Sequence, residues 1–174
     1  MRKTLLILIV SVLFSGIITA QNKELKPLFS VPSITVTDMQ GNKINTKEMN
    51  NDGNPFIISF WATWCKPCIK ELTAIAEVYE DWQDETGVKI YAVSVDDSRS
   101  SAQVKTLCNG KGWEYDILLD VNSDFKRAMN VNAVPHTFVV NGKGEVVWQH
   151  TSFSEGAELE LIQVVRDLIE QQGE

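Results

Sequence analysis

The feature that most constrains the fold is an apolar segment that leads into a Cys-x-x-Cys motif and then into an amphipathic stretch. Residues 56–61 read FIISFW, a run typical of a strand buried on both faces of a sheet. The motif Cys65-Lys-Pro-Cys68 follows a short link. Beyond it, apolar residues recur every three to four positions as far as Trp82, and Gly87 is a stop signal, so we expect one continuous helix here. The pattern places the two cysteines where a central strand gives way to a helix.

The rest of the chain alternates between strand and helix patterns. Gln40-Gly41-Asn42 is a turn signal after a β-branched segment, so it predicts an N-terminal β-hairpin. We expect residues 21–31 to form a loose lead-in. The remaining strands are expected at 88–95, 115–119, 136–140 and 145–149, and the remaining helices at 98–108, 123–129 and 155–170. This order predicts an α/β fold with a central mixed β-sheet, helices on both faces and the hairpin as an N-terminal extension.

The segment 1–20 has the layout of a secretory signal peptide. Arg2 and Lys3 precede an apolar run, and Ala20 supplies a small residue at the cleavage point. An uncleaved membrane anchor is the alternative interpretation. We therefore expect an exported protein, periplasmic or membrane-associated and facing the periplasm, with residues 21–174 as one domain. The net charge of −7 and the lack of any Lys/Arg run argue against a nucleic-acid-binding surface.

Cys65 and Cys68 are better explained by redox chemistry than by a structural disulfide, because closing so short a loop contributes little to stability. Free amide groups and the helix dipole favour an anion at the predicted helix N-terminus, where Cys65 stands. Cysteines in such Cys-x-x-Cys positions have pKa values of roughly 3.5–7.5. Cys65 is therefore the candidate nucleophile, and Cys68, one turn later and facing inward, is the candidate resolving thiol. The chain has no second pair at zinc-ligand spacing, so no metal is expected.

Two segments carry a resemblance to a known family. Phe60-Trp-Ala-Thr-Trp-Cys-Lys-Pro-Cys68 resembles the active-site motif of thioredoxins, most closely that of the TlpA/ResA-like branch, which is related to the AhpC/TSA–redoxin proteins. Val134-Pro135-His-Thr-Phe138 is similar to the segment that carries the cis-proline of that fold. The resemblance covers about residues 31–170. It implies a thioredoxin-like fold for residues 21–174.

The resemblance also implies where the site lies. Cys65 and Cys68 would form the redox-active disulfide, and Pro135 would be the cis-proline packed beside them. Trp64, Val134 and Pro135 would contact the substrate, with the backbone of Val134 open to an added substrate strand.

The same resemblance assigns a role to Glu71. Cytoplasmic thioredoxins carry a buried Asp where this chain has Ser59, whose hydroxyl cannot take up a proton. TlpA/ResA-like proteins instead use a Glu three residues after the second cysteine, and Glu71 matches it. The family commonly has Pro where Thr73 stands, so the helix geometry around Glu71 departs from the family pattern. We expect Glu71 to accept the proton of Cys68; a solvated helix carboxylate is the alternative.

Several other residues have two interpretations. Trp61 and Trp64 are expected to frame the site. His136 is expected near the dithiol, either tuning Cys65 or lying on the strand surface, and His150 is interpreted as structural. Cys108 is expected to be a buried inert thiol, with a third catalytic group as the alternative.

Together these features predict an extracytoplasmic thiol–disulfide oxidoreductase that reduces protein disulfides without a cofactor. Its partners would be protein thiols and disulfides and, as the resemblance implies, a membrane protein that donates electrons. Lys66-Pro67 is similar to the inner dipeptides of the reducing members. Two other functions stay open, a peroxiredoxin-like antioxidant peroxidase and a non-catalytic binding module. The peroxidase would need Thr-x-x-Cys, and Thr63-Trp-Cys65 has a different spacing.

Overall fold

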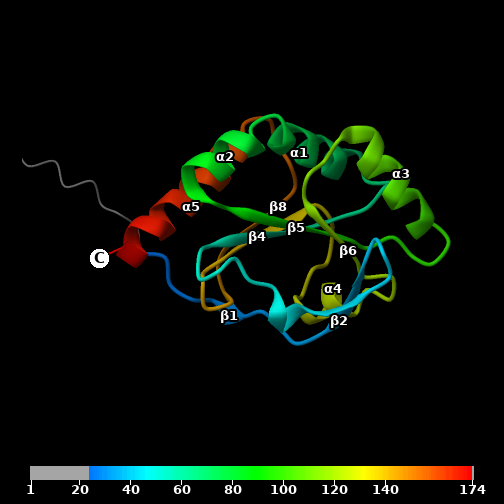
Figure 1. Cartoon of the computed structure of the whole chain (residues 1–174), viewed down its shortest axis with the longest axis horizontal. Coiled ribbons are helices and arrows are strands. Elements are labelled where there is room, and N and C mark those ends of the chain that lie inside the picture. The colour runs from blue at the N-terminus through cyan, green and yellow to red at the C-terminus, as the bar shows by residue number, and fades with distance from the viewer. Residues whose placement is uncertain (1–23, 174) are drawn as a thin grey trace, which may run out of the picture.

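An eight-stranded mixed sheet forms the centre of the protein (Figure 1). The computed structural model describes residues 24–173, so the expected signal segment 1–20 lies outside the described residues. The strand order is β1-β8-β7-β4-β5-β6-β2-β3. The strands are β1 Phe29–Ser30, β2 Thr35–Asp38, β3 Lys43–Asn45, β4 Phe56–Trp61, β5 Lys89–Ser94, β6 Asp116–Leu119, β7 His136–Val140 and β8 Glu145–Thr151.

The central strand β4 has the bounds that the apolar run predicts, and all its residues are buried. It pairs in parallel with β5 and antiparallel with β7, and β5 in turn pairs in parallel with β6. The parallel strands require crossover helices, which cover the sheet faces and explain why FIISFW is apolar on both sides. The mixed α/β sheet predicted from the sequence is confirmed.

Helices cover both faces of the sheet, as expected. Figure 1 shows α1, α2, α3 and α5 above the sheet and α4 below it. On the lower face Phe125 of α4 packs against Phe60 of β4, with ring centroids 5.1 Å apart. The helices are α1 Lys66–Ala76, α2 Tyr79–Thr86, α3 Ser101–Lys111, α4 Asp124–Ala128 and α5 Ala157–Gly173.

The predicted N-terminal hairpin is present as β2 and β3, which pair with Val36 opposite Ile44. Its turn contains Gly41 at φ +89°, a conformation that favours glycine. The Asp38 carboxylate stabilises the turn by accepting hydrogen bonds from the backbone N–H groups of Gln40 and Asn42. The hairpin extends the sheet beyond β6, to which β2 is antiparallel.

Several helix boundaries differ from those expected by one to three residues, and one expected helix is divided. The helix expected to run to Trp82 is divided, because Val78 leaves the helical conformation at φ −124°, ψ 3° and its N–H bonds to the carbonyl of Ile75 in a tighter turn. The apolar stripe continues across the break, since Tyr79 and Trp82 are buried, so periodicity alone does not reveal it. The hydroxyl of Tyr79 accepts a hydrogen bond from Ile90 N–H and so ties α2 to β5.

The α3 helix begins at Ser101 instead of residue 98, and it also ends later than expected. Asn109-Gly110 was the expected stop, but the helix continues to Lys111, and Gly112 at φ +65° caps it. A lead-in without structure was expected at 21–31, yet Phe29–Ser30 forms β1, which pairs with Val146 and Glu145 of β8. These short features depend on the partner strand or the cap and not on the local pattern.

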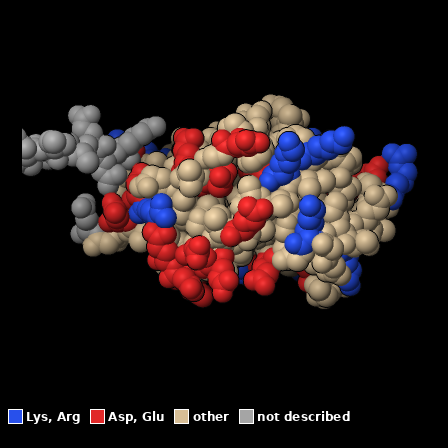
Figure 2. All heavy atoms as spheres, turned by 90° about the horizontal axis from the view of Figure 1, so that it is seen from above, with Lys and Arg blue, Asp and Glu red and all other residues tan. Residues whose placement is uncertain are grey.

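The upper helices present charged side chains to solvent. Figure 2 shows acidic side chains gathered where α2 and α5 lie. Glu80, Asp81, Asp84 and Glu85 of α2 are exposed there. Within residues 24–173 no helix is both long and apolar enough to cross a membrane.

Candidate active site

The two cysteines lie where β4 passes into α1, as the sequence predicts. Cys65 is the N-cap of α1, and its Sγ accepts a hydrogen bond from Cys68 N–H at 3.3 Å. The two sulfurs are joined in a disulfide. The exposed fraction is 5% for Cys65 and 0% for Cys68. Cys65 is therefore the cysteine of the pair that has some access to solvent. A thiolate on Cys65 would face the positive end of the helix dipole.

The loop that presents Cys65 is held from below by Asp96, a residue that the sequence interpretation missed. Asp96 follows β5 and is 1% exposed. Its Oδ2 accepts from Thr63 N–H and from the Ser94 hydroxyl, each at 2.8 Å, and its Oδ1 accepts from the Thr63 hydroxyl at 2.6 Å. A buried carboxylate with three donors is well compensated, so it fixes the loop before Cys65. The sequence signal was an acidic residue directly after a buried strand.

The Val134–Pro135 segment lies beside the dithiol, as expected, and its peptide bond is cis. Cys65 Sγ is 3.7 Å from the carbonyl oxygen of Val134. Pro135 is buried, and its carbonyl accepts from Ser152 N–H at 3.1 Å. Val134 is half-buried, and within residues 24–173 its backbone N–H makes no hydrogen bond. The segment therefore offers an unused backbone donor next to the sulfur.

The two tryptophans of the motif have different environments. Trp64 is 66% exposed and lines a hollow of about 540 Å³ with Asp97, Arg99 and Gln103 of α3. Trp61, which was expected to frame the site, is instead 0% exposed and packs edge-on against Trp113 at 5.2 Å. It is the last residue of the buried strand, so its side chain belongs to the core.

Glu71 is buried and not a surface carboxylate. It is 2% exposed, and its Oε1 accepts from the Thr137 hydroxyl at 2.6 Å. The Thr137 hydroxyl also lies 3.1 Å from the hydroxyl of Ser59. Glu71 Oε2 is buried and has no hydrogen-bond partner among residues 24–173. Glu71 lies one turn after Cys68 on the same side of α1. A carboxyl group with one free oxygen is therefore buried beneath the dithiol.

His150, interpreted as structural, reaches the same cluster. Its Nε2 is 3.5 Å from Glu71 Oε1, and its side chain is 18% exposed. Strand register explains the contact, because Ser59 pairs with Thr137 and Thr137 pairs with His150, which puts the three side chains on one face of the sheet. No local pattern in the sequence shows this row.

His136 points to the other face. Its ring stacks on Phe138 with centroids 4.3 Å apart, and its Nε2 lies 2.9 Å from Gln149 Oε1. Burial lowers the pKa of His136, although the bond to Gln149 opposes this shift. It is buried rather than on the strand surface, so the surface alternative is wrong.

Cys108 lies apart from the pair, buried in α3. Burial raises the pKa of its thiol to about 11, as expected for an inert cysteine. Among residues 24–173 no three His, Cys, Asp or Glu side chains are grouped as metal ligands would be.

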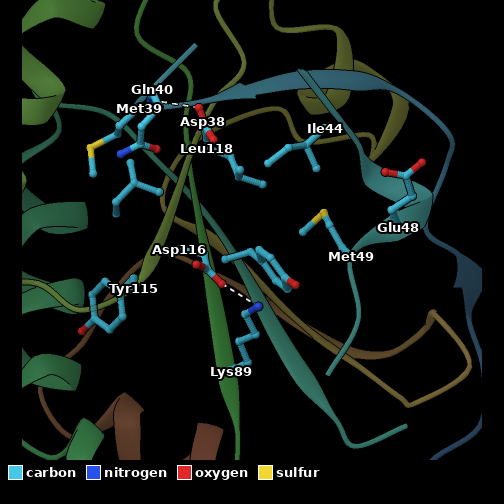
Figure 3. A pocket seen from close by; sticks show the side chains of 12 residues that line it. Asp38, Met39, Gln40, Ile44, Glu48, Met49, Lys89, Tyr115, Asp116 and Leu118 are labelled. Atoms are coloured by element: carbon cyan, nitrogen blue, oxygen red, sulfur yellow. Dashed lines mark hydrogen bonds and ion pairs between the residues drawn. The ribbon is translucent and has the colours of Figure 1, made fainter. Parts of the chain in front are cut away.

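Another hollow, of about 400 Å³, is not part of this site (Figure 3). It lies under the β2–β3 hairpin, next to the first residues of β5 and β6, where Lys89 forms an ion pair with Asp116 at 2.8 Å. The dithiol follows the last residue of β4, at the opposite end of these parallel strands.

Comparisons with known proteins agree with this geometry. The family model described as AhpC/TSA family matches residues 29–149. The thiol–disulfide oxidoreductase ResA of Bacillus thuringiensis strain Al Hakam is 33% identical over 118 residues, which span 68% of this chain and 65% of that relative. ResA of Bacillus thuringiensis subsp. konkukian is 30% identical over 78% of this chain and 75% of its own length.

Solved structures share the fold. A thioredoxin-like protein from Porphyromonas gingivalis has 51% sequence identity and a TM-score of 0.73, over 81% of this chain and 92% of that chain. StoA from Bacillus subtilis, at 22% identity and a TM-score of 0.60, covers 76% of this chain and 97% of its own. The thioredoxin-like fold implied by the sequence resemblance is confirmed. With a family model that spans most of the sheet and both site segments, this chain belongs to the AhpC/TSA family.

Proposed function

We propose that this protein is a thiol–disulfide oxidoreductase that reduces protein disulfides by exchange through Cys65 and Cys68. The observation that carries the proposal is the placement of the Cys65–Cys68 disulfide at the N-terminus of α1, with Cys65 Sγ 3.7 Å from the backbone carbonyl of Val134. The ResA relatives, named as thiol–disulfide oxidoreductases, support the same activity.

The difference in burial between the two sulfurs determines the order in which they react. In the reduced protein the Cys65 thiolate attacks one sulfur of the substrate disulfide, and the other substrate sulfur leaves as a thiolate. Cys68 then loses its proton and attacks Cys65 Sγ. The Cys65–Cys68 bond forms, the bond to the substrate breaks, and the substrate has gained two electrons. Cys68 is 0% exposed, so Cys65 is the sulfur within its reach.

Trp64, Val134 and Pro135 form the surface on which we place the substrate. Trp64 supplies an exposed aromatic face directly before the nucleophile. The unused N–H of Val134 can pair with an extended substrate segment, since strand addition uses such free backbone groups. Glu71 is the group we assign to the proton of Cys68, because it is buried one helix turn away and has a free oxygen.

Substrate trapping tests the roles of the cysteines. Cys68→Ser should accumulate mixed disulfides with substrate proteins, seen on non-reducing gels, whereas Cys65→Ser should accumulate none. Cys108→Ala is the matched control and should reduce insulin disulfides as the wild type does. Equal trapping by both variants would contradict the assignment. A wild-type protein that reduces no disulfide would favour a binding module, and one that consumes peroxide would favour a peroxidase.

We further propose that the protein is exported, and that a membrane protein supplies its electrons. The apolar run after Arg2 and Lys3 supports export. Mass spectrometry of the native protein should find a chain that begins near Gln21, whereas an intact Met1 in the membrane fraction would indicate the anchored form. A reduction potential of the Cys65–Cys68 couple well below that of its compartment would support the reducing direction.

A further inference from the structure

The Glu71 carboxyl group poses a problem of proton exchange. With 2% of its surface exposed it has almost no contact with solvent, and Cys68 is fully buried. In the resolving step Cys68 gives up one proton, and it regains one only when the disulfide is next reduced. For the proton to leave this buried pair during resolution, a second group must join Glu71 to solvent.

His150 is placed to be that group. Its Nε2 is 3.5 Å from Glu71 Oε1, and this nitrogen has no hydrogen-bond partner among residues 24–173. The separation exceeds a usual N–H···O length of about 3 Å by an amount that a small rotation of either side chain removes. With 18% of its side chain exposed, His150 reaches water where Glu71 does not.

The other polar neighbours of Glu71 cannot perform this exchange. Thr137 and Ser59 are buried hydroxyls, and the Thr137 hydroxyl already donates to Glu71 Oε1 at 2.6 Å. This hydrogen bond holds the carboxyl group in position and leaves Oε2 free for a proton. Imidazole is a side chain whose ordinary pKa lies near neutrality, so it both takes and releases a proton under physiological conditions.

We propose that His150 is the relay through which Glu71 exchanges its proton with solvent; this inference rests on the proposed function. Before Cys68 attacks Cys65 in the mixed disulfide, its proton passes to the Glu71 carboxylate and from there to the buried Nε2 of His150. The imidazolium releases its Nδ1 proton to water or buffer, so the Cys68 thiolate forms beside an ionised Glu71. The titratable groups near His150 are Glu71 of α1 and, on the other face of the sheet, His136 of β7, whose pKa a charge on His150 lowers.

Single-turnover kinetics separate the two chemical steps. The reduced protein is mixed with a disulfide-containing peptide, and the formation and the decay of the mixed disulfide are followed from pH 5.5 to 9 by acid quench. The variants are His150→Gln, His150→Phe and Glu71→Gln, with Thr151→Asn as control. His150→Phe keeps the ring that packs edge-on against Trp148, so it remains informative if His150→Gln is unstable. Thr151 is the next residue of β8 and is exposed.

We expect both His150 variants to form the mixed disulfide at the wild-type rate and to resolve it about tenfold more slowly, less than the 10²–10⁴-fold that a lost general base can cost. Added imidazole should restore resolution in the His150 variants but not in Glu71→Gln. A double variant of His150 and Glu71 should be no slower than Glu71→Gln alone.

Three results would overturn the relay. The first is wild-type resolution in the His150 variants while Glu71→Gln is slow, and the second is slow resolution that imidazole does not restore. The third is wild-type resolution in Glu71→Gln, which would leave disulfide exchange itself intact. A wild-type protein that forms no mixed disulfide would instead contradict the proposed function. The formation step of the assay shows this, separately from the resolution step that tests the relay.

Discussion

Replacing Asp96 with alanine tests whether a buried carboxylate positions the loop before Cys65. The substitution removes the acceptor for two hydroxyls and for the backbone N–H of Thr63, all within 2.8 Å. The hydroxyls of Thr63 and Ser94 can rotate toward other acceptors, but the N–H group cannot. The variant therefore leaves at least one buried donor without a partner.

The magnitude follows from these three bonds. Hydrogen bonds to charged groups contribute about 1.5–3 kcal/mol each, and an unsatisfied buried donor costs about 1–3 kcal/mol. The cost of burying the carboxylate is recovered on its removal and offsets part of this sum. We expect Asp96→Ala to lower the free energy of unfolding by about 3 kcal/mol. Asp96→Asn should cost only about 1 kcal/mol, because its carbonyl oxygen can still accept from Thr63 N–H and from the Ser94 hydroxyl, and only the Thr63 hydroxyl must reverse to accept from the amide N–H.

Urea denaturation of the oxidised protein measures the difference. Asp84→Ala is the control, since Asp84 is exposed on α2, and it should change the free energy of unfolding by less than about 0.5 kcal/mol. The same variants, after reduction, should show slower reaction of Cys65 with a disulfide in Asp96→Ala than in Asp96→Asn. An Asp96→Ala protein within about 1 kcal/mol of the wild type would refute the reasoning, because the three bonds would then have no net effect on stability.

Three further predictions follow from particular environments. Cys108 should resist alkylation in the folded protein at pH 8, because burial raises its pKa to about 11, and should react once urea unfolds the chain; rapid labelling before unfolding would contradict this. Gly110→Ala should raise the free energy of unfolding by about 0.5–1 kcal/mol, since Gly110 lies in α3 with free space around it. Gly112→Ala should lower it by about 1–2 kcal/mol, because Gly112 caps α3 at φ +65°. Thermal melts that rank the two variants in the reverse order would contradict the assignment of Gly112 as the cap. The pKa of His136 is lowered from 6.5 in the folded state, so the unfolded chain binds the proton more readily and stability should fall as pH drops below about 6.5. A His136→Gln variant should show a smaller fall in stability. A variant with the pH dependence of the wild type would show that His136 does not cause the fall.

The local features of the fold could be predicted from the sequence. Phe56–Trp61 is a strand with the expected bounds, because a run of apolar residues ended by a motif specifies a buried strand without reference to other segments. Gly41 lies in the predicted hairpin turn for a similarly local reason. The placement of Cys65 at a helix N-terminus also follows from neighbouring residues in the chain.

The surroundings of the dithiol were decided by the tertiary structure. Thr63 and Asp96 are 33 residues apart in the chain, and Glu71 and Thr137 are 66 apart. Whether such residues meet depends on which strands are neighbours and on their register, and a shift of one residue in β7 or β8 would turn Thr137 or His150 to the other face of the sheet. The chain thus carries its redox motif in a local pattern, whereas the buried groups that hold the loop and take the proton are assembled by strand pairing.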